Sequence, residues 1–343
     1  MTNSATTQRS RLVLWLGAFI GFYRPGVEEV RALDPVSRFL YAARSVILVI
    51  SAQAAIIAGL LAATDRQLHW LNFVLVFIGL VTAHMISNLS NDYFDYSRGH
   101  DTPDSPRLRY TVHPLASGVL QPRTLLTGLA VLAVVGLSIA AYFIYMHGWL
   151  AAIFFVAGVA VLFAYDAAPV PLKKIGLGEI AVLLIWGPLM IGGGYAVITG
   201  HVSIDVLFAS LPYGLGCMSI LVGKHIDQRD FDIAKGIHTL PVLIGEPAAC
   251  KLNLLLVVLM YLIVAVLVVL GRLTPFALLI LVALPRAWHA MSTFLRPRPT
   301  EAPAGYIGWP LWYHRVSLMH NRQFGWLYIL GLALGAIWPG IGR

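Results

Sequence analysis

The sequence predicts an all-α polytopic membrane protein, with about nine transmembrane helices around a central cavity and a cytoplasmic N-terminus. Three observations lead to this fold class: the composition, a series of long apolar stretches, and the placement of the basic residues. Of the 343 residues, 58% are hydrophobic and 12% are charged, and the mean hydropathy is +0.77. Because soluble domains carry about 25% charged residues, the composition excludes a soluble domain with one core.

The apolar stretches give the expected helices. A transmembrane helix needs roughly 20 apolar residues, with about 17 as the lower limit. Nine stretches come near or exceed this length, and the last is short and holds Gly331 and Gly335. They cover residues 39–63, 70–92, 124–146, 149–165, 177–199, 205–223, 251–271, 274–292 and 325–340.

The basic residues fix the orientation. If the N-terminus is cytoplasmic, every Lys and Arg except Arg66, Arg272 and Arg343 lies in an inside segment or at an inner helix end. This asymmetry is what the positive-inside rule requires. The net charge of +8 therefore reflects topology, and the sequence shows no soluble nucleic-acid-binding module. The expected inside loops are residues 93–123, 166–176, 224–250 and 293–324.

Two regions are expected along the chain: an N-terminal cytoplasmic or interfacial segment, residues 1–34, and a single nine-helix transmembrane domain, residues 35–343. Within the first, the apolar run Leu12 to Tyr23 is too short to span a membrane and lacks a small-residue cleavage site. We expect it to lie as a helix on the cytoplasmic face. Cys217 and Cys250 lack metal-ligand spacing and suit apolar packing.

A first acidic cluster closes the second apolar stretch. It comprises Asn88, Asn91, Asp92 and Asp95, with Asp101 six residues later. Asn91 and Asp95 are four residues apart and Asp92 and Asp95 three apart, so on a helix their oxygens share a face. Carboxylates at the end of a membrane helix are costly and need a reason. Hard oxygen ligands near a membrane surface suit Mg²⁺, which binds through carboxylates and substrate phosphates. A solvated helix end is the alternative, and it fits Asp101.

A second acidic cluster, Asp227, Asp230 and Asp232, follows the sixth apolar stretch. Its metal ligands are expected to be Asp227 plus Asp230, three apart on one helical face, or Asp227 plus Asp232. An acidic loop in water is the alternative. Two clusters on one side of the membrane could hold a diphosphate between them through metal ions.

Basic and aromatic residues accompany the clusters. Lys173, Lys174, Lys224 and Arg229 all lie in inside loops or at inner helix ends. They could neutralise diphosphate oxygens as a leaving group departs, or they could serve topology alone. The π face of Tyr165 could meet a developing cation. The segment Trp309 to Arg322 mixes aromatic and basic residues and is expected to be an interfacial loop.

The stretch Asn91-Asp92-Tyr-Phe-Asp95-Tyr-Ser-Arg-Gly-His-Asp101-Thr-Pro103 resembles the first aspartate-rich motif of the UbiA superfamily of intramembrane prenyltransferases, and is most similar to its 1,4-dihydroxy-2-naphthoate branch. His113-Pro-Leu-Ala-Ser-Gly118 resembles an Arg-Pro-Leu-Pro-Ser-Gly segment of that family, with His113 and Ala116 as departures. The loop from Tyr165 through Lys173 and Lys174 to Glu179 also resembles the family's. The likeness runs from about residue 38 to the C-terminus.

The second acidic cluster departs from the family pattern of two aspartates four apart, then Gly, then Thr or Ser. Gly236 and Thr239 keep that tail, and Asp232 lies four residues before Gly236. The position eight before Gly236 is Gln228, which is not an acid. Gly223-Lys224-His225-Ile226 stands where the quinone branch tends to have asparagines and an arginine.

The resemblance implies a Mg²⁺-dependent transfer of a prenyl group from a prenyl diphosphate to an aromatic acceptor such as 1,4-dihydroxy-2-naphthoate. Asn91, Asp92, Asp95, Asp227 and Asp230 would be catalytic. Substrate would bind at Asn88, Asp101, Tyr165, Lys173, Lys174, Lys224, Arg229 and Asp232, and metal at Asn91, Asp95, Asp227, Asp230 and Asp232. The expected location is the bacterial inner membrane, with the site facing the cytoplasm.

Two alternatives are kept. One is a UbiA-type prenyltransferase or terpene cyclase with a different acceptor or none. The other, from another class, is a membrane transporter that uses intramembrane acids as an ion site. Against the transporter, the acids lie at helix ends on one face rather than near the midplane.

Overall fold

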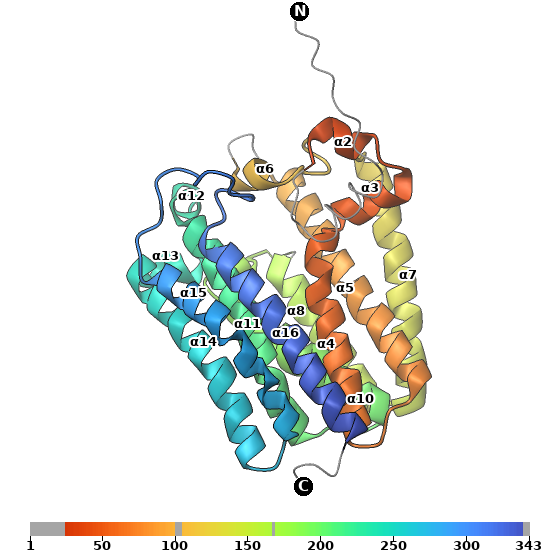
Figure 1. The fold of residues 1–343 in the computed structure, drawn as a ribbon. Coiled ribbons are helices and arrows are strands. Elements are labelled where there is room, and N and C mark those ends of the chain that lie inside the picture. The colour runs from red at the N-terminus through yellow and green to blue at the C-terminus, as the bar shows by residue number, and fades with distance from the viewer. Residues whose placement is uncertain (1–24, 100–104, 167–168, 339–343) are drawn as a thin grey trace, which may run out of the picture.

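The computed structural model describes residues 25–99, 105–166 and 169–338. All regular structure in these ranges is helical, and the long helices run side by side as one bundle (Figure 1). The long segments are α4 (Ser45–Thr64), α5 (Trp70–Ser97), α7 (Pro122–His147), α8 (Trp149–Asp166), the continuous run α9 (Gly178–Leu184), η2 (Ile185–Gly192) and α10 (Gly193–Thr199), α11 (Ile204–Asp227), α14 (Glu246–Val269), the run η3 (Pro275–Ala283) and α15 (Leu284–Phe294), and α16 (Tyr313–Ile337).

Within the described residues, seven of these segments are long and apolar enough to cross a membrane. In addition, α8 is a shorter apolar helix over Trp149–Tyr165, and α16 is long but more polar. The protein is therefore an all-helical, multi-pass membrane protein, as the composition predicts. Each of the nine predicted stretches overlaps one long helical segment, while nine as the number of crossings stays a prediction.

The first predicted stretch, residues 39–63, is divided in the structure. Asp34 caps α3 (Pro35–Ala42) by accepting hydrogen bonds from the backbone N–H groups of Val36 and Ser37. Arg44 then adopts a left-handed backbone conformation, with φ of 60°, and separates α3 from α4. A single hydropathy window cannot detect this break because the residues on both sides are apolar.

The last helix begins earlier than the sequence predicts. The expected stretch is 325–340, and residues 309–322 were expected to be a loop, whereas α16 starts at Tyr313. The loop prediction is therefore wrong for residues 313–322. The first three turns of α16 carry Ser317, His320 and Asn321, which are buried against other helices. Hydropathy misses such a helix because its polar side chains face the bundle rather than lipid.

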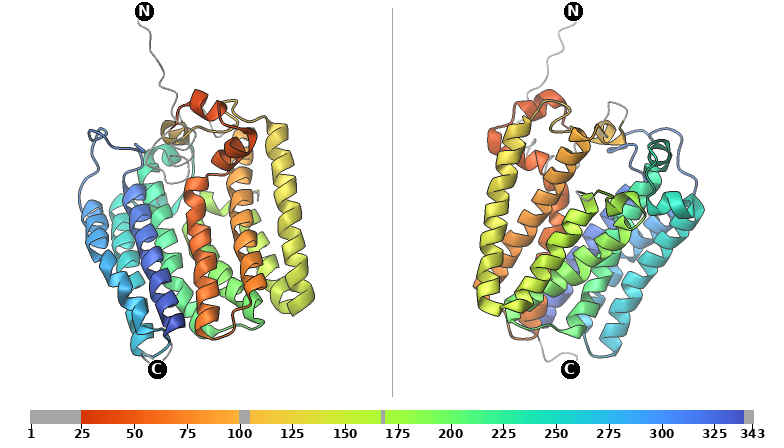
Figure 2. Two further views of the ribbon diagram at one scale, coloured as in Figure 1. Left: turned by 45° about the vertical axis from the view of Figure 1, so that its right-hand side comes forward. Right: turned by 180° about the vertical axis from the view of Figure 1, so that it is seen from behind.

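The short helices gather at one end of the bundle. Figures 1 and 2 show α2 (Val27–Arg31), α3, α6 (Pro106–Tyr110) and α12 (Arg229–Ala234) at the end where α5 and α11 finish and α16 begins. The remaining short helices are η1 (Leu172–Lys174) and α13 (Leu240–Ile244). This is the end predicted to face the cytoplasm. The predicted helix over Leu12 to Tyr23 lies outside the described residues.

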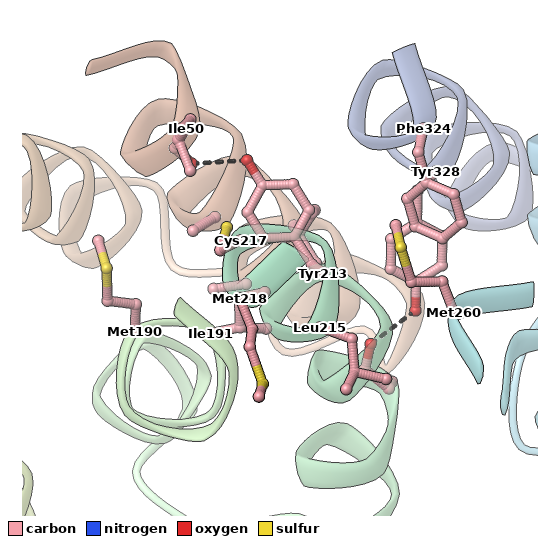
Figure 3. Close-up of a cluster of buried hydrophobic side chains, with 14 of the residues drawn as sticks. Ile50, Met190, Ile191, Tyr213, Leu215, Cys217, Met218, Met260, Phe324 and Tyr328 are labelled. Carbon is pink, nitrogen blue, oxygen red and sulfur yellow. Dashed lines mark hydrogen bonds between the residues drawn. The ribbon is translucent and has the colours of Figure 1, made fainter. Parts of the chain in front are cut away.

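The centre of the bundle is α11, which packs against helices from both halves of the chain. Its buried Tyr213 donates its hydroxyl to the carbonyl of Ile50 at 2.8 Å, and Tyr328 of α16 donates to the carbonyl of Ala209 at 2.9 Å (Figure 3). A Cβ on Gly216 would lie 1.9 Å from Oδ1 of Asn321. Small residues of this kind let membrane helices approach closely, so α11 holds the bundle together around the cavity described next.

Candidate active site

One large cavity joins the ends of α5 and α11. Its volume is about 1440 Å³. The polar wall includes Asn91 and Asp95 from α5, and Gln228 and Asp232 from the α11–α12 junction. Deeper in the bundle the wall is apolar and comes from α5, α7, α8 and η2. That deeper lining includes Leu80, Phe143, Phe154, Phe155, Leu162 and Met190. The cavity therefore has a polar mouth and an apolar interior.

The first acidic cluster lies on one continuous helix, as predicted, because α5 extends to Ser97. Asn88, Asn91 and Asp95 all line the cavity. The buried Asn88 also donates a hydrogen bond to the carbonyl of Ala43 at 3.0 Å, which ties α5 to the turn before α4. Asn91 accepts a hydrogen bond from Nη2 of Arg44 at 3.1 Å. The oxygens of Asn91 and Asp95 thus face the cavity from successive turns.

Asp92 has a different place. Its side chain is fully buried and does not line the cavity. One carboxylate oxygen forms an ion pair with Arg44, and the other lies 2.6 Å from Nη2 of Arg107. Asp92 therefore holds two arginines that line the cavity, which differs from the direct catalytic contact that the sequence predicts for it.

The loop after α8 supplies cations and an aromatic ring. Tyr165, Lys173 and Lys174 all line the cavity, as their predicted substrate contacts require. The ammonium of Lys173 lies 3.0 Å from Oδ2 and 3.2 Å from Oδ1 of Asp95. A cation that pairs with this carboxylate is close enough to meet anionic oxygens bound there. Asp101 lies outside the described residues.

Asp227 points away from the cavity. It is buried, and its carboxylate accepts hydrogen bonds from the backbone N–H groups of Tyr313 at 3.1 Å and His314 at 2.9 Å. Arg298 donates to the backbone carbonyl of Asp227 at 2.9 Å. Asp227 therefore caps the first turn of α16, where free N–H groups and the helix dipole favour a negative charge. The predicted metal site requires Asp227 and Asp95 to line one cavity. In the structure Asp95 lines the cavity and Asp227 does not.

Asp230 and Arg229 also lie outside the cavity lining. The Asp230 side chain is fully exposed, and Arg229 lies 4.0 Å from it. Arg229 donates from Nε to the carbonyl of Pro241 at 3.3 Å. The structure therefore contradicts the prediction that Asp227 with Asp230 faces the first acidic cluster. Arg229, predicted to bind substrate, instead connects α12 to α13 through the carbonyl of Pro241.

Asp232 is the acid of the second acidic cluster that reaches the cavity. It is buried, and the hydroxyl of Thr239 donates to its Oδ2 at 3.3 Å. Lys224 and Gln228 line the cavity beside it, at spacings of eight and four residues. Burial raises the pKa of the Asp232 carboxyl, and the charges of His225 and Lys224 partly offset this. Asp232 and Lys224 therefore lie where their predicted substrate contacts require.

Several residues of the site were not singled out by the sequence analysis: Arg44, Arg107 and Tyr110 line the cavity. Burial raises the pKa of the Tyr110 hydroxyl, but the charges of Lys224, Arg107 and Arg44 and a side-chain hydrogen bond with Gln228 outweigh it, so this pKa lies below its usual value. No local signal marks Arg44 because it lies more than 40 residues before the residues that it contacts.

A buried pair positions the second wall of the cavity. Oε1 of Glu179 in α9 lies 2.7 Å from Nδ1 of His225 in α11 and accepts from the N–H of Leu240 at 3.3 Å. One carboxylate thus connects three elements that surround Asp232. The spacing of the sequence gives no hint of this contact, although Glu179 lies in the segment that resembles the family's loop.

The donor set fits magnesium only with help from a substrate. Among the described residues, no group of three or more His, Cys, Asp or Glu side chains is placed to hold a metal ion. The oxygens available are those of Asn91 and Asp95 on one wall and Asp232 on the other. These are hard ligands of the kind that Mg²⁺ uses with one or two carboxylates and substrate phosphates.

Comparison with known proteins decides the family. The sequence profile of the UbiA prenyltransferase family matches residues 52–308. The chain belongs to this family. It is therefore a prenyltransferase, and the cavity between α5 and α11 is its candidate active site. Membership also counts against the transporter alternative.

Curated relatives agree with this. The chain is 30% identical over 272 residues to UbiA prenyltransferase domain-containing protein 1 of Xenopus tropicalis, covering 78% of this chain and 73% of the relative. It is 23% identical over 264 residues to the 1,4-dihydroxy-2-naphthoate octaprenyltransferase of Bacillus subtilis, covering 76% of this chain and 81% of that enzyme.

Solved structures share the fold. A digeranylgeranylglyceryl phosphate synthase superposes with a TM-score of 0.58 at 19% identity, over 89% of this chain and 99% of that chain. A UbiA homologue from Archaeoglobus fulgidus, bound to GPP and Mg²⁺, superposes with a TM-score of 0.54 at 15% identity, over 84% of this chain and 99% of that chain. The metal in that homologue is the one that the sequence of this chain predicts.

Proposed function

We propose that this UbiA-family enzyme transfers a prenyl group from a prenyl diphosphate to an aromatic acceptor of the quinone-precursor type, with Mg²⁺ as cofactor. The observation that carries the proposal is that Asn91 and Asp95 on α5 line the same cavity as Lys224 and Asp232 from the other wall of the bundle. Its polar mouth suits a diphosphate and its apolar interior suits a prenyl chain. A water-poor interior also protects a carbocation from hydrolysis.

The residues divide the work between them. Asn91, Asp95 and Asp232 would hold Mg²⁺ together with the diphosphate oxygens. When bound, the ion supplies positive charge for the leaving pyrophosphate. Lys173, Lys174 and Lys224 line the same mouth and stabilise the same developing charge. Asp92 keeps Arg44 and Arg107 in place at the mouth.

The reaction balances as a substitution at carbon. The allylic C–O bond breaks, and its electron pair leaves with the pyrophosphate oxygen. The electron-rich ring carbon of the acceptor forms the new C–C bond, and the group that it displaces leaves the ring without its bonding electrons. The ring of Tyr165, on the cavity wall, would face the developing allylic cation.

The acceptor class is supported by a relative rather than by geometry. The Bacillus subtilis relative is named for 1,4-dihydroxy-2-naphthoate, and the resemblance of the first acidic cluster points to the same branch. A UbiA-type prenyltransferase or terpene cyclase with another acceptor, or none, is the second candidate, favoured by the departure at Gln228. The orientation, with the site facing the cytoplasm, is proposed from the positive-inside rule. The bacterial inner membrane is proposed from the likeness to the Bacillus subtilis enzyme.

The test is a product assay with the purified full-length protein. Prenyl diphosphates of several chain lengths are incubated with Mg²⁺ and with 1,4-dihydroxy-2-naphthoate or other phenolic acceptors. We expect pyrophosphate release and a product whose mass shows the prenyl group on the acceptor ring. Release with a cyclised hydrocarbon and no adduct would support the cyclase candidate, and no release with any donor would contradict both.

A further inference from the structure

Carboxylates are scarce at the mouth of the cavity. Among the described residues, Asp95 and Asp232 are the acidic side chains in the lining. Basic side chains are much more numerous there. Those at the polar end are Arg44, Arg107, Lys173, Lys174, Lys224 and Arg315. Arg44 and Arg107 pair with Asp92, and Lys173 pairs with Asp95. A diphosphate bound here would meet these pairs together with Lys174, Lys224 and Arg315, so protein cations would supply part of the positive charge that metal ions would otherwise supply.

The position facing the first acidic cluster is neutral where the family pattern has an acid. Gln228 stands four residues before Asp232 and lines the cavity. Tyr110 of α6 lines the same cavity as Gln228. A primary amide is a weaker ligand for a divalent cation than a carboxylate, because it carries no charge.

A cation already stands beside this position. Lys224 precedes Gln228 by four residues, one turn back along the same wall, and lines the cavity with it. Asp232 and Tyr110 line the same cavity. Two like charges a few ångströms apart repel each other strongly in a partly desolvated site. A second divalent ion on this wall would therefore meet one carboxylate, one neutral amide and one opposing ammonium.

We propose that this protein works with a single divalent ion at its diphosphate site, and that Lys224 and Gln228 make the contacts to the diphosphate that a second ion would make. The ion is held by Asn91 and Asp95, with Asp232 on the opposite wall. The inference rests on the proposed function, because it assumes that a diphosphate occupies the mouth of this cavity. It deepens that function by assigning how the pyrophosphate charge is shared between metal and protein.

The test counts bound ions directly. Full-length protein in lipid nanodiscs is titrated with Mn²⁺, followed by electron paramagnetic resonance, with and without a prenyl diphosphate analogue whose bridging oxygen is replaced by sulfur. We expect one analogue-dependent Mn²⁺ per chain. Two such ions would overturn the inference and leave the proposed function standing. No analogue-dependent Mn²⁺ would overturn the proposed function and, with it, the inference.

Two variants separate the roles of the α11 residues. Gln228→Asp supplies the missing carboxylate, and we expect it to bind a second Mn²⁺ in the presence of the analogue; one ion in a folded variant would overturn the role given to Gln228. Lys224→Gln should keep one Mn²⁺ but weaken analogue binding roughly 10- to 100-fold, through loss of a charge-assisted contact. Unchanged affinity would overturn the role of Lys224. Asp230→Asn, fully exposed beside them, is the matched control and should match the wild type.

Discussion

The two acidic clusters are both expected to bind metal, yet the structure uses them differently. The first acidic cluster lies on one unbroken helix, and its Asn91 and Asp95 face the cavity while Asp92 holds two arginines. The second acidic cluster straddles a helix break. Within this cluster, Asp227 caps α16, Asp230 is exposed to solvent, and only Asp232 lines the cavity. Similar sequence patterns therefore give unlike sites when the backbone beneath them differs.

The helix break explains the difference. α11 ends at Asp227, Gln228 lies between helices with φ of −108° and ψ of 5°, and α12 begins at Arg229. Spacing rules for one helical face hold only within a continuous helix. The expected pair of Asp227 and Asp230 assumed that continuity, and the break turns their side chains in different directions.

The largest effect that tests the comparison is expected at Asp95. Asp95→Asn keeps the shape of the side chain but removes its charge, and turnover should fall roughly 100- to 1,000-fold, the range for loss of one electrostatic contact to a developing anion. Steady-state pyrophosphate release measures this, with the elution profile in detergent as the check on folding. A folded variant with near-normal turnover would falsify the role given to the first acidic cluster.

The next effect distinguishes two acids of the second acidic cluster. Asp232→Asn should lower turnover about 10- to 100-fold and raise the Mg²⁺ concentration for half-maximal rate, as changes near a metal site do. Asp230→Asn should stay within about twofold of the wild type, because its side chain is fully exposed. The two variants are assayed side by side over a Mg²⁺ series. Equal losses of turnover in both variants would contradict the assignment of Asp232, rather than Asp230, to the cavity wall.

A smaller effect, on stability, is expected where α11 meets the start of α16. A Cβ on Gly223 would lie 2.9 Å from the backbone atoms of Tyr313 and His314, so these helices must separate. Gly223→Ala should cost about 1–3 kcal/mol, as overpacking does, and lower the thermal unfolding midpoint. Gly158→Ala is the control, since its Cβ would meet nothing within 4 Å. Equal midpoints for both variants would contradict the close approach.

The smallest effect is expected at Asp227. Asp227→Asn keeps one acceptor oxygen, so it can hold only one of the two backbone N–H groups of Tyr313 and His314 that the carboxylate holds. It also removes the charge that faces Arg298 at 4.0 Å. The loss of one hydrogen bond should cost about 0.5–1.5 kcal/mol, so the unfolding midpoint should fall slightly, and turnover should stay within about twofold of the wild type. A turnover loss as large as that of Asp95→Asn would restore Asp227 to the metal site and undo the contrast between the clusters.

The sequence predicts what local pattern and hydropathy encode. The helical bundle, the helical face of Asn91 and Asp95, and the cationic loop at Lys173 follow from spacing and charge alone. Contacts between distant segments do not. Arg44 reaches Asp92 from 48 residues away, and Asp227 caps a helix that begins 86 residues later. No short window contains both partners. The sequence therefore predicts a catalytic role for Asp92 and a metal-binding role for Asp227, whereas in the structure each has a structural partner.

The central claim is that residues of α5 and of the α11–α12 junction bind the same diphosphate from opposite walls of one cavity. A double-mutant cycle on binding of the sulfur-bridged prenyl diphosphate analogue tests it, using the wild type, Asp95→Asn, Asp232→Asn and the double variant, by calorimetry in Mg²⁺. Residues that act through one bound ligand and ion are coupled, so the double variant should lose clearly less affinity than the sum of the single losses in free energy. Strictly additive losses would mean that the two walls do not share a ligand.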